Sequence, residues 1–518
     1  MKQIAEHKNA KKMRPTRRIL LLCLAAMMQL ATAAGQNVFH AKSEKFTARA
    51  GGKELFVEHF KAIQYVDFTV VGKTDLTVTF DAPVTAFRIS PLARRITGQS
   101  EGAQLRFQIP GPGYYVVEVN NREKLVILAN APLKETPPLR QGVLNARDYV
   151  SDLTGSSLQT AALQKALNEA ARTGKTLVFP KGVYRTGTLT IGSNTHVFLE
   201  EGALIKGSED RNDYPTDNNL MEADHINNKA NYSDNGEFMT FSRLILIDRA
   251  DGVHIWGRGT IDGSGTVVRA QGKPANLLRI RNSRNVLIEG IILRDPAAWN
   301  THILHSEKVT IRDVKVLNDF EVHNTDGFDP DASKEVMIDH CFAYCNDDNI
   351  AIKTTNNLNL LQDLEKVTVR NCVFITRKSS LKVGTETKGA LMRDILFENN
   401  DVLECDRGLA LYCNDGATFE NIRFVNNRIE RNFPDAQRRA IYFAIGNRSG
   451  KGQIKKVLIK DCRFYEKFPN GSTIKGLDNE HQIDGIVFDG VTIAGRKMTS
   501  LSDLGIAETP FVKNITVK

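Results

Sequence analysis

The segment Val286-Leu287-Ile288-Glu289-Gly290 decides the fold, because close copies of it recur through the second half of the chain. The copies begin at Val309, Val336, Val367, Ile395, Ile422, Val457 and Ile486. The successive starts are 23, 27, 31, 28, 27, 35 and 29 residues apart. Each copy has an apolar-x-apolar core followed by a polar or glycine turn, and no helical pattern separates the copies. A repeat of this kind predicts a solenoid of parallel strands, which is a parallel β-helix.

This repeat places three aspartates in one register. Asp326 precedes Asp347 by 21 residues and Asp348 by 22, which is close to one lap. Positions one lap apart stack about 5 Å apart along the axis, so we expect the three carboxyls to share one patch. Aspartates are also common in turns, and it is the matched register that favours a functional patch over a plain loop.

Carboxyls packed together raise the pKa of at least one of them, which can then donate a proton while a neighbour stays ionised. A protonated carboxyl beside an ionised one is the arrangement that a glycosidase uses to protonate the leaving oxygen and activate a water molecule. For such a pair in an inverting enzyme we expect the Asp347 carboxyl about 6.5–9.5 Å from the water-activating carboxylates, or slightly less.

Other segments of the second half fit the solenoid. Residues 157–172 place leucines and alanines at helical spacing and end at Gly174, which predicts a helix that caps the first lap. Residues 208–243 are too polar for the core and indicate a loop over the side, either shaping a cleft or a plain insertion. Asn399, Asn400, Asn426 and Asn427 fall in the turns, where stacked amides can hydrogen-bond along the axis.

The first part of the chain has a different pattern. Residues 37–133 alternate apolar and polar positions between Gly/Pro turns, which predicts a small antiparallel β-sandwich. Tyr114 and Tyr115 fit half-buried strand positions better than a sugar-stacking platform. Residues 134–142, with Pro137-Pro138, are expected to be a linker, and residues 143–518 to form the β-helix catalytic domain.

Residues 1–33 are interpreted as a signal peptide, because a basic region precedes an apolar run and a small-residue cleavage site. The chain is therefore expected to be exported, to the periplasm, the cell surface or the medium. A lipoprotein site at Cys23 is the alternative, but the residues before it lack the small side chains that such a site prefers. No other segment approaches twenty apolar residues, so we expect no membrane span.

The basic net charge of the chain is no evidence for a nucleic-acid partner. The formal net charge of the 518 residues is +9, and residues 1–33, with seven basic residues against Glu6, supply six of these charges. The remaining composition is that of an ordinary globular protein. Oligomeric state is left open by the sequence.

Six cysteines follow the predicted signal peptide, and an even number in an exported chain permits disulfides. However, Cys341, Cys372 and Cys462 occupy the same place in three copies of the repeat, where they would stack as small core residues. Neither a cysteine metal site nor a dense disulfide framework is indicated.

Several motifs together resemble glycoside hydrolase family 28, the polygalacturonases. The motifs are the runs at 176–189, 199–203 and 257–263, Trp299, Asn324-Thr325-Asp326-Gly327 and Asp347-Asp348. The resemblance covers roughly residues 143–495 and implies a right-handed parallel β-helix that hydrolyses with inversion and without a cofactor or metal. It further implies that Asp347 is the general acid, while Asp326 and Asp348 hold and activate water.

Two departures from the family pattern bear on the substrate. The family's Gly-His-Gly falls on Lys378-Ser379-Ser380, and its carboxylate-binding Arg-Ile-Lys falls near Gly408-Leu409-Ala410-Leu411-Tyr412. The aspartates are thus retained while the elements that recognise a uronate are missing, so a neutral substrate is plausible. The related family 49 dextranases share the β-helix and three aspartates and also begin with a β-sandwich.

Further polar residues near the aspartates are candidates for binding sugar. They are Asn324, His323, Lys353, Lys382, Glu386, Arg407 and Tyr412. Each could equally be a solvated outward-facing residue. The alternatives to a polygalacturonase-like hydrolase are a dextranase-type α-glucan hydrolase, a polysaccharide lyase on the same scaffold, and a glycan-binding solenoid without activity.

Overall fold

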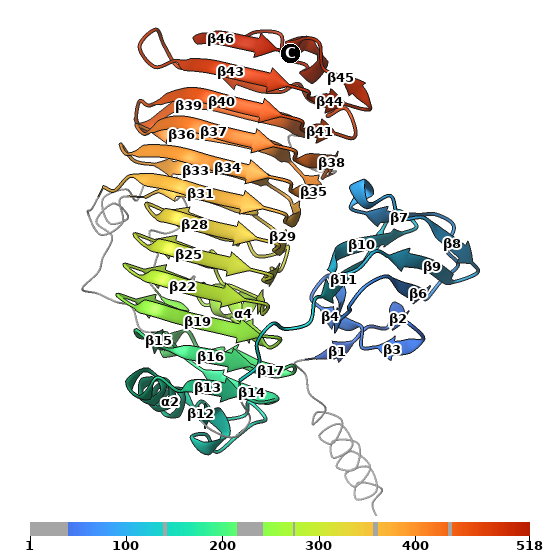
Figure 1. The fold of residues 1–518 in the computed structure, drawn as a ribbon, viewed down its shortest axis with the longest axis vertical. Helices are drawn as coiled ribbons and strands as arrows, with labels where there is room; N and C mark the ends of the chain where they lie inside the picture. Colours follow the sequence, from blue (N-terminus) through green and yellow to red (C-terminus); the bar gives the residue numbers. More distant parts are fainter. Residues whose placement is uncertain (1–39, 138–141, 215–241, 273–274, 356–360, 434–437) are drawn as a thin grey trace, which may run out of the picture.

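The computed structural model describes residues 40–137, 142–214, 242–272, 275–355, 361–433 and 438–518. The predicted signal peptide and most of the polar insertion lie outside these residues. A β-sandwich precedes a long stack of parallel strands and lies against its side (Figure 1). Within the part of the chain that the structure describes, no helix has the length and apolarity needed to cross a lipid bilayer.

The sandwich consists of two sheets around an apolar core. The first contains, in spatial order, β1 (Ala41–Lys42), β4 (Glu58–Phe60), β5 (Ile63–Thr69), β11 (Glu123–Asn130), β10 (Gly113–Val119) and β7 (Phe87–Ser90). The second contains β3 (Lys53–Leu55), β2 (Phe46–Ala50), β6 (Thr74–Phe80), β9 (Gln104–Ile109) and β8 (Gly98–Glu101). The prediction of a sandwich is confirmed, although β5 and β11 pair in parallel and the sheets are therefore not wholly antiparallel.

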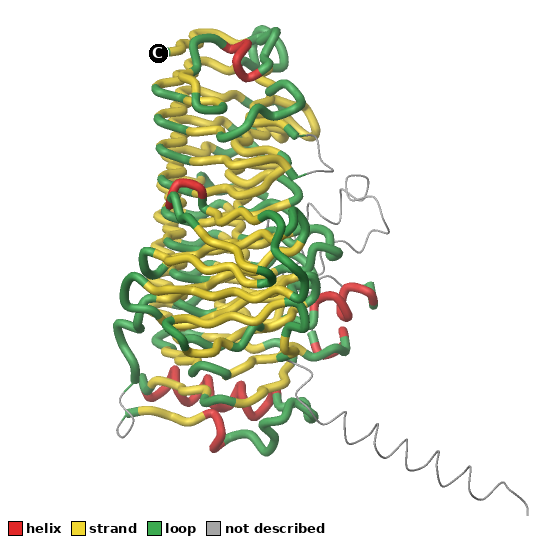
Figure 2. The backbone as a smooth tube through the Cα atoms, turned by 90° about the vertical axis from the view of Figure 1, so that its right-hand side faces the viewer, coloured by secondary structure: helices red, strands yellow, loops and turns green. Residues whose placement is uncertain are grey.

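Three parallel sheets form the β-helix, and each complete lap contributes one strand to each sheet. Figure 2 shows the laps stacked along the long axis. The first sheet contains β12 (Val143–Asn145), β13 (Thr176–Phe179), β16 (His196–Leu199), β19 (Asp251–Gly257), β22 (Arg284–Glu289), β25 (Glu307–Arg312), β28 (Lys334–Asp339), β31 (Leu364–Arg370), β34 (Leu391–Glu398), β37 (Thr418–Val425), β40 (Gln453–Lys460), β43 (Ile483–Asp489) and β46 (Val512–Val517).

The other two sheets follow the same order along the axis. The second contains β14 (Gly182–Thr186), β17 (Ala203–Gly207), β20 (Thr260–Asp262), β23 (Ile292–Arg294), β26 (Lys315–Leu317), β29 (Phe342–Cys345), β32 (Val373–Thr376), β35 (Asp401–Cys405), β38 (Arg428–Asn432), β41 (Arg463–Phe464), β44 (Thr492–Ile493) and the antiparallel β45 (Arg496–Lys497). The third contains β15 (Leu189–Ile191), β18 (Arg243–Asp248), β21 (Asn276–Arg281), β24 (Thr301–Leu304), β27 (Phe328–Asp331), β30 (Ile350–Thr354), β33 (Ser379–Thr387), β36 (Arg407–Asp415), β39 (Arg439–Gly450) and β42 (Thr473–Lys475).

The predicted repeat is the first sheet of this β-helix. Val286 pairs with Val309, which pairs with Val336, and all three are buried in the core. The six cysteines are free and buried, and for Cys341, Cys372 and Cys462 this confirms the core positions that the repeat predicted. Asparagine stacking is also confirmed, because Asn400 donates to Asn427 across 2.9 Å.

Helix α2 (Thr160–Thr173) covers the first laps, as predicted, and ends at Gly174 with a left-handed φ of 67°. At the side of the β-helix, the outer face of the second sheet packs against the sandwich. Phe60, Tyr65 and Tyr114 of the sandwich share one apolar cluster with Leu317 and Phe342. The sandwich therefore covers the second sheet and leaves the outer face of the third sheet for a site.

Candidate active site

Three aspartates lie together at the edge where the second sheet passes into the third. Asp326 comes just before β27, whereas Asp347 and Asp348 lie between β29 and β30. Phe328 pairs with Ile350 in the third sheet, and this register stacks Asp326 on Asp348. One carboxylate oxygen of each aspartate lies within 4.8 Å of the other two. The predicted patch is formed, and its nearest oxygens are closer than the 6.5–9.5 Å expected between the carboxyls of an inverting pair.

The backbone at this edge is held by close packing and by buried amides. A Cβ atom at Gly327 would lie 2.5 Å from the carbonyl oxygen of Asn349, so only glycine lets the two laps approach. Asn318 donates to the carbonyl of Thr325 across 2.8 Å, and Asn300 donates to Asn318 across 2.9 Å. These hydrogen bonds pair buried polar groups of the turn and fix the loops that carry the aspartates.

Lys353 lies at the centre of a buried group of acids. Its Nζ is 3.1 Å from Asp326 Oδ2 and 3.3 Å from both Asp329 Oδ1 and Glu386 Oε2. The same ammonium lies 3.6 Å from the centroid of the Trp299 ring, which adds a cation–π contact. These contacts hold the Lys353 ammonium in place, and its positive charge neutralises part of the negative charge of the acids.

Lys382 makes the second buried ion pair, with Asp348 Oδ2. Its Nζ also lies 5.2 Å from the centroid of the Tyr412 ring. Tyr412 in turn accepts a hydrogen bond from Arg407 across 2.7 Å and stacks on Tyr442, with centroids 4.6 Å apart. The third sheet thus brings Lys382, Arg407 and Tyr412 to one side of the aspartates.

The acids outnumber the cations, and the pKa values follow from this imbalance. Burial, reinforced by Asp326 and Asp348, raises the pKa of Asp347 to about 7. Burial also raises the pKa of Asp329 to about 6, although Lys353 opposes it. Among the described residues, Asp347 forms no ion pair with a basic side chain. Burial raises the pKa of Asp326 as well, but there the Lys353 ammonium opposes the shift directly.

The remaining candidates have different surroundings. Glu386 lies 3.6 Å from Arg448, and although burial acts against ionisation, Lys353 and Arg448 lower the pKa of its carboxyl. Asn324 is half-buried and accepts a hydrogen bond from Arg269 across 3.2 Å. His323 is exposed beside it. The predicted sugar-binding residues other than His323 and Asn324 are therefore linked to the aspartate cluster by named contacts.

Two residues of the cluster were not predicted. Asp329 faces outward from β27 beside Lys353, and strand alternation counted from the core residue Phe328 could have indicated it. Arg269 belongs to α4 (Gly265–Ala270), 55 residues before the Asn324 that it contacts, and no sequence pattern marks it.

The three aspartate oxygens are also close enough to ligate one cation. Lys353 and Lys382 already provide positive charge to Asp326 and Asp348, and buried acids are stable when paired in this way. With the protonated form of Asp347 favoured, the arrangement is that of an acid–base site built from side chains alone.

Comparison with known proteins agrees with this geometry. The family model described as glycosyl hydrolases family 28 matches residues 225–500, about half of the chain. A probable polygalacturonase of Vitis vinifera is 24% identical over 273 residues, covering 50% of this chain and 54% of that protein. An exo-poly-α-D-galacturonosidase of Dickeya chrysanthemi is 24% identical over 433 residues, covering 70% of this chain and 69% of that one.

Solved structures share the fold. The family 28 exopolygalacturonase of Yersinia enterocolitica superposes with a TM-score of 0.58 at 16% identity, over 85% of this chain and 96% of that one. Dex49A of Penicillium minioluteum has a TM-score of 0.57 at 12% identity, over 93% of this chain and 95% of that one. With the family match over half of its length and the right-handed parallel β-helix of these neighbours, the chain belongs to glycoside hydrolase family 28.

Proposed function

We propose that the chain is an exported, polygalacturonase-like hydrolase that cleaves O-glycosidic bonds with inversion. Asp347 is the general acid, and Asp326 and Asp348 are the carboxylates that hold and activate water. The observation that carries this proposal is that Asp347 lacks a basic partner in the described cluster, while Lys353 and Lys382 pair with the other two aspartates. The raised pKa of about 7 for Asp347 suits a proton donor near neutral pH.

In the reaction, Asp347 gives its proton to the glycosidic oxygen as the bond from that oxygen to the anomeric carbon breaks. Asp326 and Asp348 hold a water molecule, and one of the two carboxylates takes its proton as the water oxygen attacks the anomeric carbon from the opposite face. Lys353 and Lys382 pair with these two aspartates and hold them in place. Arg407, Tyr412 and the exposed His323 remain on the open side and are assigned to substrate contact.

The substrate class is proposed from the relatives. The Dickeya protein acts on poly-α-D-galacturonate by its name. Arg407, which also pairs with Asp406 across 3.0 Å, is the cation beside the site that we assign to a uronate carboxylate. The signal-peptide pattern of residues 1–33 supports export.

A polysaccharide lyase is disfavoured by Lys382. A lyase base would have to be neutral, but although burial disfavours its charged form, Asp348 raises the pKa of Lys382 above the ordinary value. The ammonium therefore stays protonated at neutral pH and cannot abstract a proton.

The test combines product analysis with one substitution. Purified enzyme is incubated with polygalacturonate and with dextran, and proton NMR follows the first-formed reducing-end anomer. We expect polygalacturonate hydrolysis with the anomer opposite to the cleaved linkage. Asp347→Asn should lower kcat by about 10³-fold or more with the fold intact, whereas the exposed Asp484→Asn serves as the unchanged control.

Three outcomes would contradict parts of this proposal. Retention of the anomer would fit the short oxygen separation and overturn the inverting mechanism. An unsaturated, ultraviolet-absorbing product would identify a lyase. Full activity of Asp347→Asn would remove this residue from the mechanism.

A further inference from the structure

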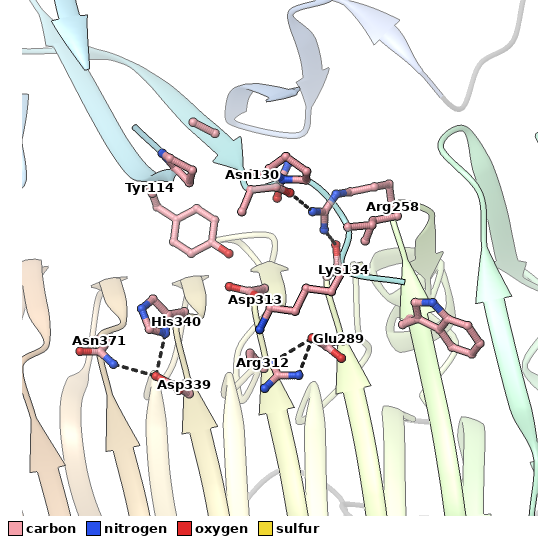
Figure 3. Close-up of a pocket in the computed structure, with 18 of the residues that line it drawn as sticks. Tyr114, Asn130, Lys134, Arg258, Glu289, Arg312, Asp313, Asp339, His340 and Asn371 are labelled. Carbon is pink, nitrogen blue, oxygen red and sulfur yellow. Dashed lines mark hydrogen bonds and ion pairs between the residues drawn. The ribbon is translucent and has the colours of Figure 1, made fainter. Parts of the chain in front are cut away.

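A cavity lies at the junction of the sandwich and the β-helix, away from the aspartate cluster (Figure 3). Its volume is about 690 Å³. The walls come from the ends of β10 and β11, from residues 131–135 and from the ends of five strands of the first sheet, β19, β22, β25, β28 and β31. We call this cavity the junction pocket.

The floor of the junction pocket is a row of side chains from successive laps. Trp256 pairs with Glu289, Glu289 with Arg312, and Arg312 with Asp339. At about 4.8 Å per lap, the row is roughly 14 Å long. Arg312 and Glu289 are joined across 2.6 Å, so part of the floor is a fixed, planar ion pair. The floor is therefore long and regular, as an extended ligand requires.

Two polar groups face this space without a protein partner among the described residues. Tyr114 has an exposed fraction of 8%, yet its hydroxyl makes no hydrogen bond there. Asp313 is half-buried, and no hydrogen bond or ion pair engages its carboxylate. Burial raises the pKa of Asp313, as expected for a carboxyl with little compensation. Both groups are therefore open to a ligand that enters the junction pocket.

The charges that line the junction pocket balance one another. The basic residues are Arg94, Lys134, Arg258 and Arg312, and the acidic residues are Glu135, Glu289, Asp313 and Asp339. A polyanion would gain no net attraction from this lining. A neutral ligand rich in hydroxyls would match it, because each hydroxyl both donates and accepts.

The junction pocket and the aspartate cluster belong to the same laps. His340, which lines the pocket, precedes β29, and Asp347 follows that strand. The seven residues between them span at most about 25 Å, and because the sandwich covers β29, a polysaccharide that contacts both places has to pass around the sandwich. A chain held at the junction would raise the local concentration of the same polymer at the cluster.

We propose that the junction pocket is a second glycan-binding site, which takes a neutral oligosaccharide segment through Asp313 and Tyr114. The site is separate from the cleavage site and does not depend on which linkage is cut. It would be missed in assays with short substrates and would act on long or branched polysaccharides.

Isothermal titration calorimetry with the full-length Asp347→Asn protein tests the proposal. The probes are tetrasaccharides from galactan, arabinan, dextran and cellulose, with tetragalacturonate as the charged comparison. We expect at least one neutral tetrasaccharide to bind, and Asp313→Asn combined with Tyr114→Phe to weaken that binding at least tenfold. Both substitutions keep side-chain size, and Asp484→Asn is the matched control.

Kinetics give the second readout. With Asp347 intact, Asp313→Asn and Tyr114→Phe should leave kcat unchanged and raise KM for a long polysaccharide only. The proposal is overturned if no neutral tetrasaccharide binds, if the two substitutions leave that binding unchanged, or if only tetragalacturonate binds. Thermal unfolding of the single variants checks that any loss of binding occurs in folded protein.

Discussion

Two buried clusters of charge in this protein have opposite effects on the pKa of one acid in each, Asp262 and Asp347. At the sandwich interface, Arg294 donates to Asp262 across 2.7 Å and to Glu58 across 2.5 Å, and Lys206 donates to Asp262 across 2.6 Å. This interface cluster holds two acids and two cations. The active-site cluster holds five carboxyls around the buried Lys353 and Lys382, with Arg448 at its margin.

Burial is similar in the two clusters, so the balance of charge decides the outcome. Burial disfavours the Asp262 carboxylate, yet Lys206 and Arg294 lower its pKa to about 2. Burial and two neighbouring aspartates raise the pKa of Asp347 to about 7. Asp262, which is paired with two cations, thus serves structure, whereas Asp347, which has no ion pair among the described residues, retains a proton that it can donate.

The largest expected effect is on stability, when one cation is removed from either cluster. Arg294→Met and Lys353→Met each leave buried acids unpaired, and each should lower the free energy of unfolding by roughly 3–5 kcal/mol. Urea unfolding measures this loss. The folded fraction of Arg294→Met should keep its specific activity, whereas Lys353→Met should lose it. Equal loss of specific activity in both variants would contradict the assignment of a structural role to one cluster and a catalytic role to the other.

The exposed pair of Lys451 and Asp478, 3.0 Å apart, is the control for these variants. Lys451→Met should leave unfolding unchanged, because solvent screens exposed pairs.

A smaller effect is expected from Lys382→Gln on pH dependence. The Lys382 charge favours the ionised form of Asp347, so its removal raises the pKa of Asp347 further. The basic limb of kcat/KM should then move upward by about one pH unit, while kcat falls because Asp348 loses its partner. A basic limb that stays in place would show that Lys382 does not act on the proton donor.

The smallest effect is on how stability varies with pH. Asp347 binds its proton more tightly in the folded state, so its contribution to stability falls as pH rises from about 4 to about 7. Asp347→Asn should therefore be more stable than wild type at pH 8, by about 1 kcal/mol or more. Asp262→Asn should be less stable at pH 7, because Asp262 stabilises the fold above pH 4 and loses this effect as pH falls toward 2. Unfolding of both variants and of wild type at pH 4 and pH 8 shows whether each substitution raises or lowers the stability.

Much of the fold was predictable because a β-helix converts sequence period into spatial contact. The offsets that align Val286 with Val309 also bring Asp326 to Asp348, and both predictions are confirmed. Contacts between distant segments were not predictable. Nothing in the sequence indicates that Arg269 reaches Asn324, or that β5 pairs in parallel with β11. The oxygen spacing was also missed, since it depends on side-chain direction rather than on register.

The pH dependence of kcat/KM, measured on the polysaccharide that the enzyme hydrolyses, tests the central claim most directly. If Asp347 is the buried proton donor of an acid-rich cluster, kcat/KM should fall above a pKa of about 7. A value of kcat/KM that stays constant from pH 6 to about pH 9 would contradict the account.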